Sequence, residues 1–188
     1  MMEVRRWTMG FWKTLTSPVP GTFKELGRLG EEQPVASLVV LSFAFLIYDL
    51  VGVYSTGISS SITDVILTIV SGVLMIAFWI AILHFLYQRI FDRKEIVFNP
   101  LLFAGVCTFI VSQGLGVILW FVPVIGEASG LISVIYLVAL MTSAVMGVTS
   151  LSFGRSLAIV IISVPITLIF MFLIYSLLPM VPRILGGN

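Results

Sequence analysis

The chain has 188 residues, of which 59% are hydrophobic and 10% are charged, whereas soluble domains have roughly 45–50% apolar and about 25% charged residues. A soluble fold of this length cannot bury so much apolar surface, so the composition predicts a membrane protein. The formal net charge of +1 excludes the general basic surface of a nucleic-acid-binding protein, and we expect no nucleic-acid partner.

The first predicted element is a cytoplasmic or interfacial segment over residues 1–34. Aromatic and basic residues recur near helical spacing at its start, and Pro18 and Pro20 separate this start from a second short helix that carries Phe23 and Leu26. Such helices lie flat at the headgroup level, with tryptophan rings in the interfacial layer. We expect one or two amphipathic helices that either brace the bundle or form a docking or curvature-sensing surface. The residues assigned here to membrane or partner contacts are Arg5, Arg6, Trp7, Trp12 and Lys13.

Five long apolar stretches follow, and each is long enough, at ~1.5 Å per residue, to cross a ~30 Å hydrocarbon core. We therefore predict an all-α fold: a membrane bundle of five transmembrane helices over residues 35–188. Turns rich in Ser, Gly and Pro separate the helices, and Pro165 is expected to kink the last one. The predicted spans cover about residues 35–54, 62–87, 100–122, 131–151 and 157–178.

Lys and Arg residues fall in alternate gaps between these stretches. Because basic loops stay in the cytoplasm during insertion, this distribution predicts a cytoplasmic N-terminus and an external or lumenal C-terminus. We expect the cell membrane in a prokaryote and an endomembrane in a eukaryote. In the inner loops we assign Arg93, Lys94 and Arg155 to contacts with lipid headgroups or a protein partner. Nine of the ten basic residues follow the pattern: Arg5, Arg6, Lys13, Lys24, Arg28, Arg89, Arg93, Lys94 and Arg155.

Small residues recur every four positions in the third and fourth spans. Such stripes allow neighbouring helix backbones to approach closely inside a membrane. They predict that the third and fourth spans pack on each other, and a homo-oligomer contact is the alternative interpretation. The stripes consist of Ala104, Thr108, Ser112 and Gly116 in the third span and of Ala139, Ser143 and Gly147 in the fourth.

Acidic residues gather on the predicted outer side. Asp49 lies within the outer half of the first span, where an ionised carboxylate costs at least ~2.5 kcal/mol. Asp64 opens the second span, and Glu127 lies in the next outer loop. In one interpretation, Asp49 hydrogen-bonds to nearby hydroxyl groups or stays protonated close to the interface. In the alternative, the acids begin a cation or proton path, with Gln113 along it, in a small transporter or channel subunit.

The sequence lacks the constellations that membrane enzymes need. It has no nucleophile elbow, no H-E-x-x-H motif and no Walker-type loop, and no cluster of His, Asp or Glu has metal-ligand spacing. The only histidine, His84, lies near the cytoplasmic end of the second span, away from the outer acids. We therefore predict a protein that is not an enzyme and that uses no cofactor or metal.

The order of the elements resembles the Yip domain family, five-span integral membrane proteins named for interaction with Ypt and Rab GTPases. The resemblance rests on PGTFKEL at residues 20–26, SFGRSLA at residues 152–158 and the last span with its proline. It implies a cytoplasmic N-terminus and roles in vesicle trafficking or membrane shaping. Eukaryotic members carry a longer polar N-terminal region, so this chain looks like the compact prokaryotic, particularly archaeal, branch. The resemblance thus predicts a membrane adaptor or organiser with a protein partner at its cytoplasmic face.

Overall fold

The computed structural model describes residues 9, 12–31, 37–47, 62–93, 95, 97–122 and 125–177. Within these residues the chain forms helices and turns and no strand, which agrees with the predicted all-α class. A short helical segment at residues 12–16 and an apolar helix, Ser37–Ile47, accompany the longer elements. The longer elements are α2 (Pro20–Gly30), α4 (Ile62–Phe91), α5 (Phe98–Trp120), the 3-10 helix η1 (Gly126–Ala128), α6 (Ser129–Thr149) and α7 (Phe153–Leu177).

Four helical stretches are long and apolar enough to cross a membrane, so the chain is an integral membrane protein. These stretches correspond to the last four predicted spans. The first predicted span, about residues 35–54, lies partly outside the described residues. Its described part, Ser37–Ile47, is shorter than the ~20 residues that a span requires, so the five-span count stays a prediction. The four stretches are Val65–Phe91, Phe98–Trp120, Gly126–Thr149 and Phe153–Phe170.

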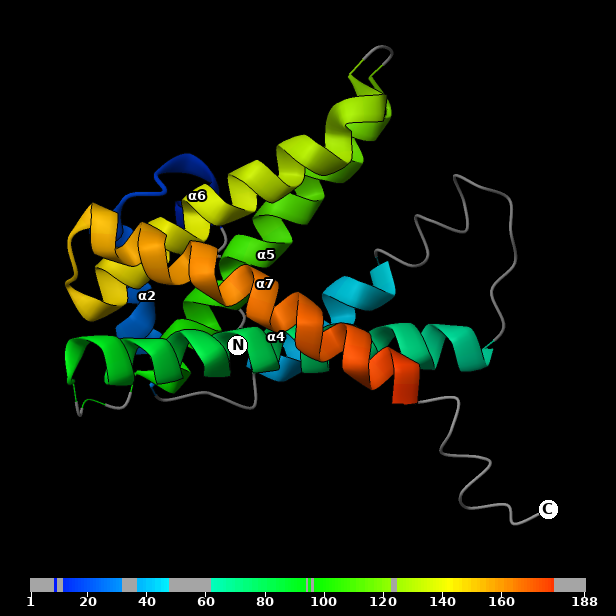
Figure 1. The fold of residues 1–188 in the computed structure, drawn as a ribbon. Coiled ribbons are helices and arrows are strands. Elements are labelled where there is room, and N and C mark those ends of the chain that lie inside the picture. Colours follow the sequence, from blue (N-terminus) through cyan, green and yellow to red (C-terminus); the bar gives the residue numbers. More distant parts are fainter. Residues whose placement is uncertain are drawn as a thin grey trace.

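The four long helices form two antiparallel pairs (Figure 1). α5 and α6 pack along each other as a hairpin closed by η1, and α4 packs along α7. The pairs meet where α4 and α6 end and where α5 and α7 begin, and they diverge from there. We call this meeting place the basic end, because all Lys and Arg residues that the structure describes lie at it: Lys13, Lys24, Arg28, Arg89, Arg93 and Arg155.

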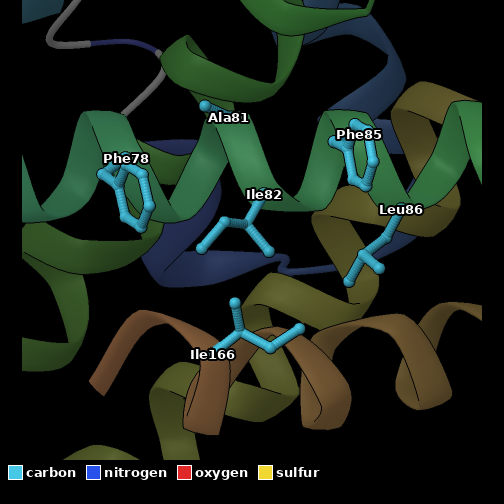
Figure 2. Close-up of a pocket in the computed structure, with 6 residues that line it drawn as sticks. All are labelled: Phe78, Ala81, Ile82, Phe85, Leu86 and Ile166. Atoms are coloured by element: carbon cyan, nitrogen blue, oxygen red, sulfur yellow. The ribbon is translucent and has the colours of Figure 1, made fainter. Parts of the chain in front are cut away.

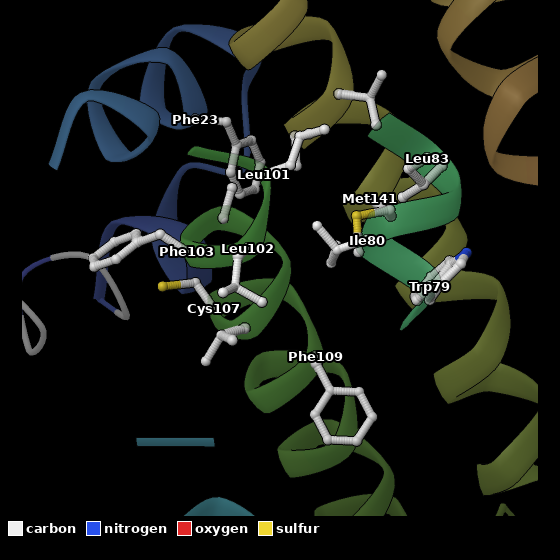
Figure 3. Packing of buried hydrophobic residues seen from close by; sticks show 14 of the residues in the cluster. Phe23, Trp79, Ile80, Leu83, Leu101, Leu102, Phe103, Cys107, Phe109 and Met141 are labelled. Atoms are coloured by element: carbon white, nitrogen blue, oxygen red, sulfur yellow. The ribbon is translucent and has the colours of Figure 1, made fainter. Parts of the chain in front are cut away.

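The core lies around the first half of α5, which α2, α4 and α6 enclose. Phe23 of α2, Ile80 of α4 and Met141 of α6 are each 0% exposed and belong to one cluster with the buried residues of α5 (Figure 3). Near the centre of this cluster, a Cβ added to Gly105 would lie 2.6 Å from Ile80 Cδ1 and 3.3 Å from Met141 Cε. The missing side chain at Gly105 therefore lets three helices approach closely.

The apolar helix Ser37–Ile47 connects the two pairs. The Phe45 ring lies 5.1 Å from the Phe109 ring of α5, measured between centroids. The same ring occupies the space beside Gly72 of α4. Leu41 and Phe45 are 0% and 9% exposed, so this helix covers part of the core where the pairs separate.

Two residues with left-handed backbone conformation end helices at the basic end. Asp92 follows α4 with a φ of 48°, and Ser150 follows α6 with a φ of 57°. The N–H of Ser150 donates to the Met146 carbonyl at 2.9 Å, and the N–H of Arg93 donates to the Gln88 carbonyl at 3.3 Å. These bonds satisfy carbonyl groups at the helix ends, and the sharp turns bring both connections to the same end of the bundle.

Candidate functional site

The first component of the candidate site is α2, which packs against α5 and α6 at the basic end. Phe23 and Leu26 are 0% and 1% exposed, whereas Lys24, Glu25 and Arg28 on the opposite face are exposed. The apolar face of α2 is therefore covered by protein, and only its polar face points outward. α2 is part of the bundle, in contrast to a helix that lies alone on a membrane surface.

Glycine residues allow α2 to lie this close to its neighbours. A Cβ at Gly27 would lie 3.1 Å from Val148 Cγ2 of α6. A Cβ at Gly147 of α6 would lie 2.8 Å from Phe23 Cβ and 2.9 Å from the Lys24 nitrogen. Because part of this contact is backbone, a larger side chain at Gly147 would displace α2.

The small residues predicted in the third span lie inside the bundle. Ala104, Thr108 and Ser112 are 0% exposed. The Thr108 hydroxyl donates to the Gly105 carbonyl at 2.8 Å, and the Ser112 hydroxyl donates to the Phe109 carbonyl at 3.0 Å. Since both hydroxyl groups bond within their own helix, the stripe offers a closely packing surface and not a set of interhelical hydrogen bonds.

The stripe predicted in the fourth span is less buried than the stripe in the third span. Ala139 is exposed, Ser143 is half-buried, and Gly147 faces α2. α5 and α6 do pack on each other, but Gly116 of α5 faces Ser133, which lies outside the stripe. The four-residue spacing thus predicted the right pair of helices, but Gly147 and Gly116 have neighbours outside the two stripes.

An ion pair joins the segment before α2 to its polar face. Lys13 Nζ donates to Glu25 Oε2 at 2.7 Å. The neighbouring Trp12 is 63% exposed, which suits an amphipathic ring at a membrane interface. The contact holds the segment of residues 12–16 beside the polar face of α2.

Two arginine side chains at the basic end lie over aromatic rings. Arg155 Cζ of α7 is 5.7 Å from the centroid of the Phe91 ring, and Arg89 Cζ of α4 is 5.7 Å from that of Phe85. Neither guanidinium forms an ion pair with a residue that the structure describes. The rings hold both cations by cation–π attraction and leave their N–H groups available for an anion.

Carboxylates also lie at the basic end, although cations outnumber them. Tyr87 OH donates to Glu95 Oε2 at 2.9 Å, which holds the turn after α4 against that helix. Glu31 and Asp92 are exposed. The surface is therefore of mixed charge with a cationic excess.

The remaining predicted site residues are not brought together by any described contact. The side chain of Asp64 is not described, and Glu127 is exposed in η1, at the tip of the α5–α6 hairpin far from the basic end (Figure 1). Pro165 lies inside α7, which continues to residue 177. Within the described part of the chain, no three His, Cys, Asp or Glu residues could hold a metal ion. The predicted residues outside that part are Arg5, Arg6, Trp7, Asp49 and Lys94.

Sequence reasoning missed the contact that joins α4 to α7. Trp79 Nε1 donates to Ser163 Oγ at 2.7 Å, and both residues are buried. Beside this bond, the Phe78 and Phe170 rings stack with 3.7 Å between centroids. No spacing rule links residues so far apart in the chain. The close packing of α2, in contrast, has a signal in the sequence, because Gly27 and Gly30 recur on the same helix face as Phe23.

Comparisons of the chain with protein-family models, with curated proteins and with solved structures found no match. The resemblance to the Yip family therefore stays an expectation from the sequence. The geometry of the basic end is the main support for a function.

Proposed function

We propose that the protein is a non-enzymatic membrane adaptor or organiser whose basic end faces the cytoplasm and docks a protein partner. The observation that carries this proposal is the packing of α2 against the bundle. Its apolar residues are buried against α5 and α6, and its polar face is held outward beside exposed cations. A surface fixed before binding loses less conformational entropy when a partner docks.

The positive-inside rule supports the cytoplasmic orientation of the basic end. The described Lys and Arg residues lie at this end, whereas the opposite tip of the α5–α6 hairpin carries Glu127. Trp120 at that tip is 60% exposed and Trp12 near the basic end is 63% exposed. Tryptophan at both ends is typical of the two membrane–water interfaces.

The resemblance to the Yip family supports the same role. The segment at residues 20–26 that carries part of the resemblance begins α2, and the segment at residues 152–158 covers the start of α7 at the basic end. The proposal accordingly includes membrane organisation or a trafficking-like function in a prokaryotic, particularly archaeal, cell membrane.

The orientation can be tested by labelling single cysteines with a membrane-impermeant maleimide. The native Cys107 is 1% exposed and gives a low background. We expect Glu127→Cys to react in intact cells and Arg28→Cys to react only after the membrane is permeabilised. The reverse pattern would overturn the cytoplasmic orientation.

The partner can be tested by capturing the tagged full-length protein from native membranes in mild detergent. We expect the double variant Lys24→Glu and Arg28→Glu to lose a stoichiometric partner that the wild type retains. Both side chains are exposed, so the substitutions should leave the packing of α2 against α5 and α6 unchanged. Deleting α2 would instead uncover α5 and α6. Glu127→Lys at the opposite tip is the matched control and should retain the partner. Equal capture by all three proteins would count against docking on α2.

A further inference from the structure

A furrow runs along the contact between α4 and α7, on a side that the rest of the described chain leaves open. Its cavity volume is about 300 Å³. Phe85 and Ile166 in its wall are 56% and 40% exposed, and both helices belong to the membrane-crossing stretches, so the furrow opens to lipid. The lining is entirely apolar and consists of Phe78, Ala81, Ile82, Phe85, Leu86 and Ile166 (Figure 2).

The end of the furrow at Phe78 lies at the middle of the membrane-crossing stretch of α4. The stacked rings of Phe78 and Phe170 lie at that end, and the hydrogen bond from Trp79 to Ser163 ties the helices together beside the stack. From Phe78 to Leu86, α4 rises about 12 Å at ~1.5 Å per residue, which is close to half of a ~30 Å hydrocarbon core. The length of the furrow therefore matches a single leaflet.

The other end of the furrow, at Phe85 and Leu86, points toward the basic end, where α4 and α7 each carry an exposed arginine. Arg89 lies one helical turn beyond Phe85, and its Cζ is 5.7 Å from the centroid of that lining ring. Arg155 extends from the neighbouring α7 and lies over Phe91, the last residue of α4. Arginine N–H groups in this position can bind a phosphate through two parallel hydrogen bonds.

No carboxylate that the structure describes near this opening forms an ion pair with either arginine. Glu95 accepts a hydrogen bond from Tyr87. Asp92, in the turn after α4, forms no ion pair with a described residue. The apolar furrow thus leads toward cations at headgroup depth.

We propose that the furrow binds one anionic phospholipid, with an acyl chain between α4 and α7 and the phosphate at Arg89 and Arg155. Charge complementarity favours this occupant over a second copy of the chain. Two copies inserted in the same orientation would bring their basic ends together, and like charges would repel each other. An anionic headgroup instead neutralises both guanidinium groups.

Lipid retention by the purified full-length protein in mild detergent, measured by native mass spectrometry, tests the proposal. The probes are phosphatidylglycerol and phosphatidylcholine with identical acyl chains. We expect one phosphatidylglycerol to bind at concentrations where phosphatidylcholine does not. Replacing Arg89 and Arg155 by Gln should weaken phosphatidylglycerol binding about 25-fold, or about five-fold for each cation removed. Ile166→Trp should fill the furrow and weaken retention of both lipids.

Matched variants separate this site from general lipid adhesion. Arg28→Gln removes an exposed cation at the basic end away from the furrow, and Leu74→Trp adds a ring to an exposed position of α4 outside the lining. Both should bind phosphatidylglycerol like the wild type. If Ile166→Trp fails to fold, the arginine pair alone decides the result. Equal retention of the two lipids, equal loss in Arg28→Gln, or a dimer that Ile166→Trp abolishes would overturn the proposal.

Discussion

α5 and α4 are both apolar membrane helices, yet they differ in how far the rest of the protein buries them. In the most apolar 18 residues of each crossing stretch, 61% are buried in α5, whereas 28% are buried in α4 and in α7. The two helices are nevertheless similarly hydrophobic along their length. In a membrane, hydrophobicity alone does not bury a helix, because lipid is equally apolar. Small residues that permit close approach determine which helix becomes the centre.

The largest effect is expected where close approach involves backbone. Gly147→Ala should lower the free energy of unfolding by about 1–3 kcal/mol, because the new Cβ meets Phe23 and the Lys24 nitrogen of α2 and overpacking carries a cost of this size. The measurement is thermal unfolding in detergent micelles.

Gly114→Ala in α5 provides the matched control for this substitution. A Cβ at Gly114 would meet nothing within 4 Å, so alanine should leave stability unchanged or raise it through its higher helix propensity. Equal destabilisation by the two alanines would show that α2 is not held by close packing on α6.

An intermediate effect is expected at the contact between α4 and α7. A double-mutant cycle with Trp79→Phe and Ser163→Ala should give a coupling energy of about 0.6 kcal/mol and at most ~1.7 kcal/mol, as for other interhelical hydrogen bonds in membranes. Ser112→Ala is the control, because the Ser112 hydroxyl donates only within its own helix. A coupling near zero would leave ring stacking and lipid to hold this pair.

The same contrast explains what the sequence could predict. Hydropathy and span length located α4, α5, α6 and α7, because a helix that crosses lipid must satisfy its own backbone. The polarity of α2 was also visible, since Phe23 and Leu26 lie on one face and Lys24 and Arg28 on the other. Each of these features is local in the chain.

Spacing correctly predicted that the third and fourth spans pack on each other, but it did not show which residues form the contact. The stripe ending at Gly147 was assigned to a contact with the third span, whereas Gly147 faces α2. The bond between Trp79 and Ser163, which helps to define the furrow, joins residues 84 positions apart. Such contacts depend on the angle between the two helix pairs, and no local sequence pattern predicts that angle.

The smallest effect is expected at the rim of α2. Lys13→Gln should lower stability by less than about 0.5 kcal/mol, because exposed ion pairs contribute little and the side chains of Lys13 and Glu25 are 36% and 58% exposed. The small difference from the wild type should disappear at high salt, where screening removes the attraction. Glu25→Gln should behave in the same way. A loss as large as that of Gly147→Ala would mean that the ion pair, and not the burial of Phe23 and the glycine contacts, holds α2 on the bundle.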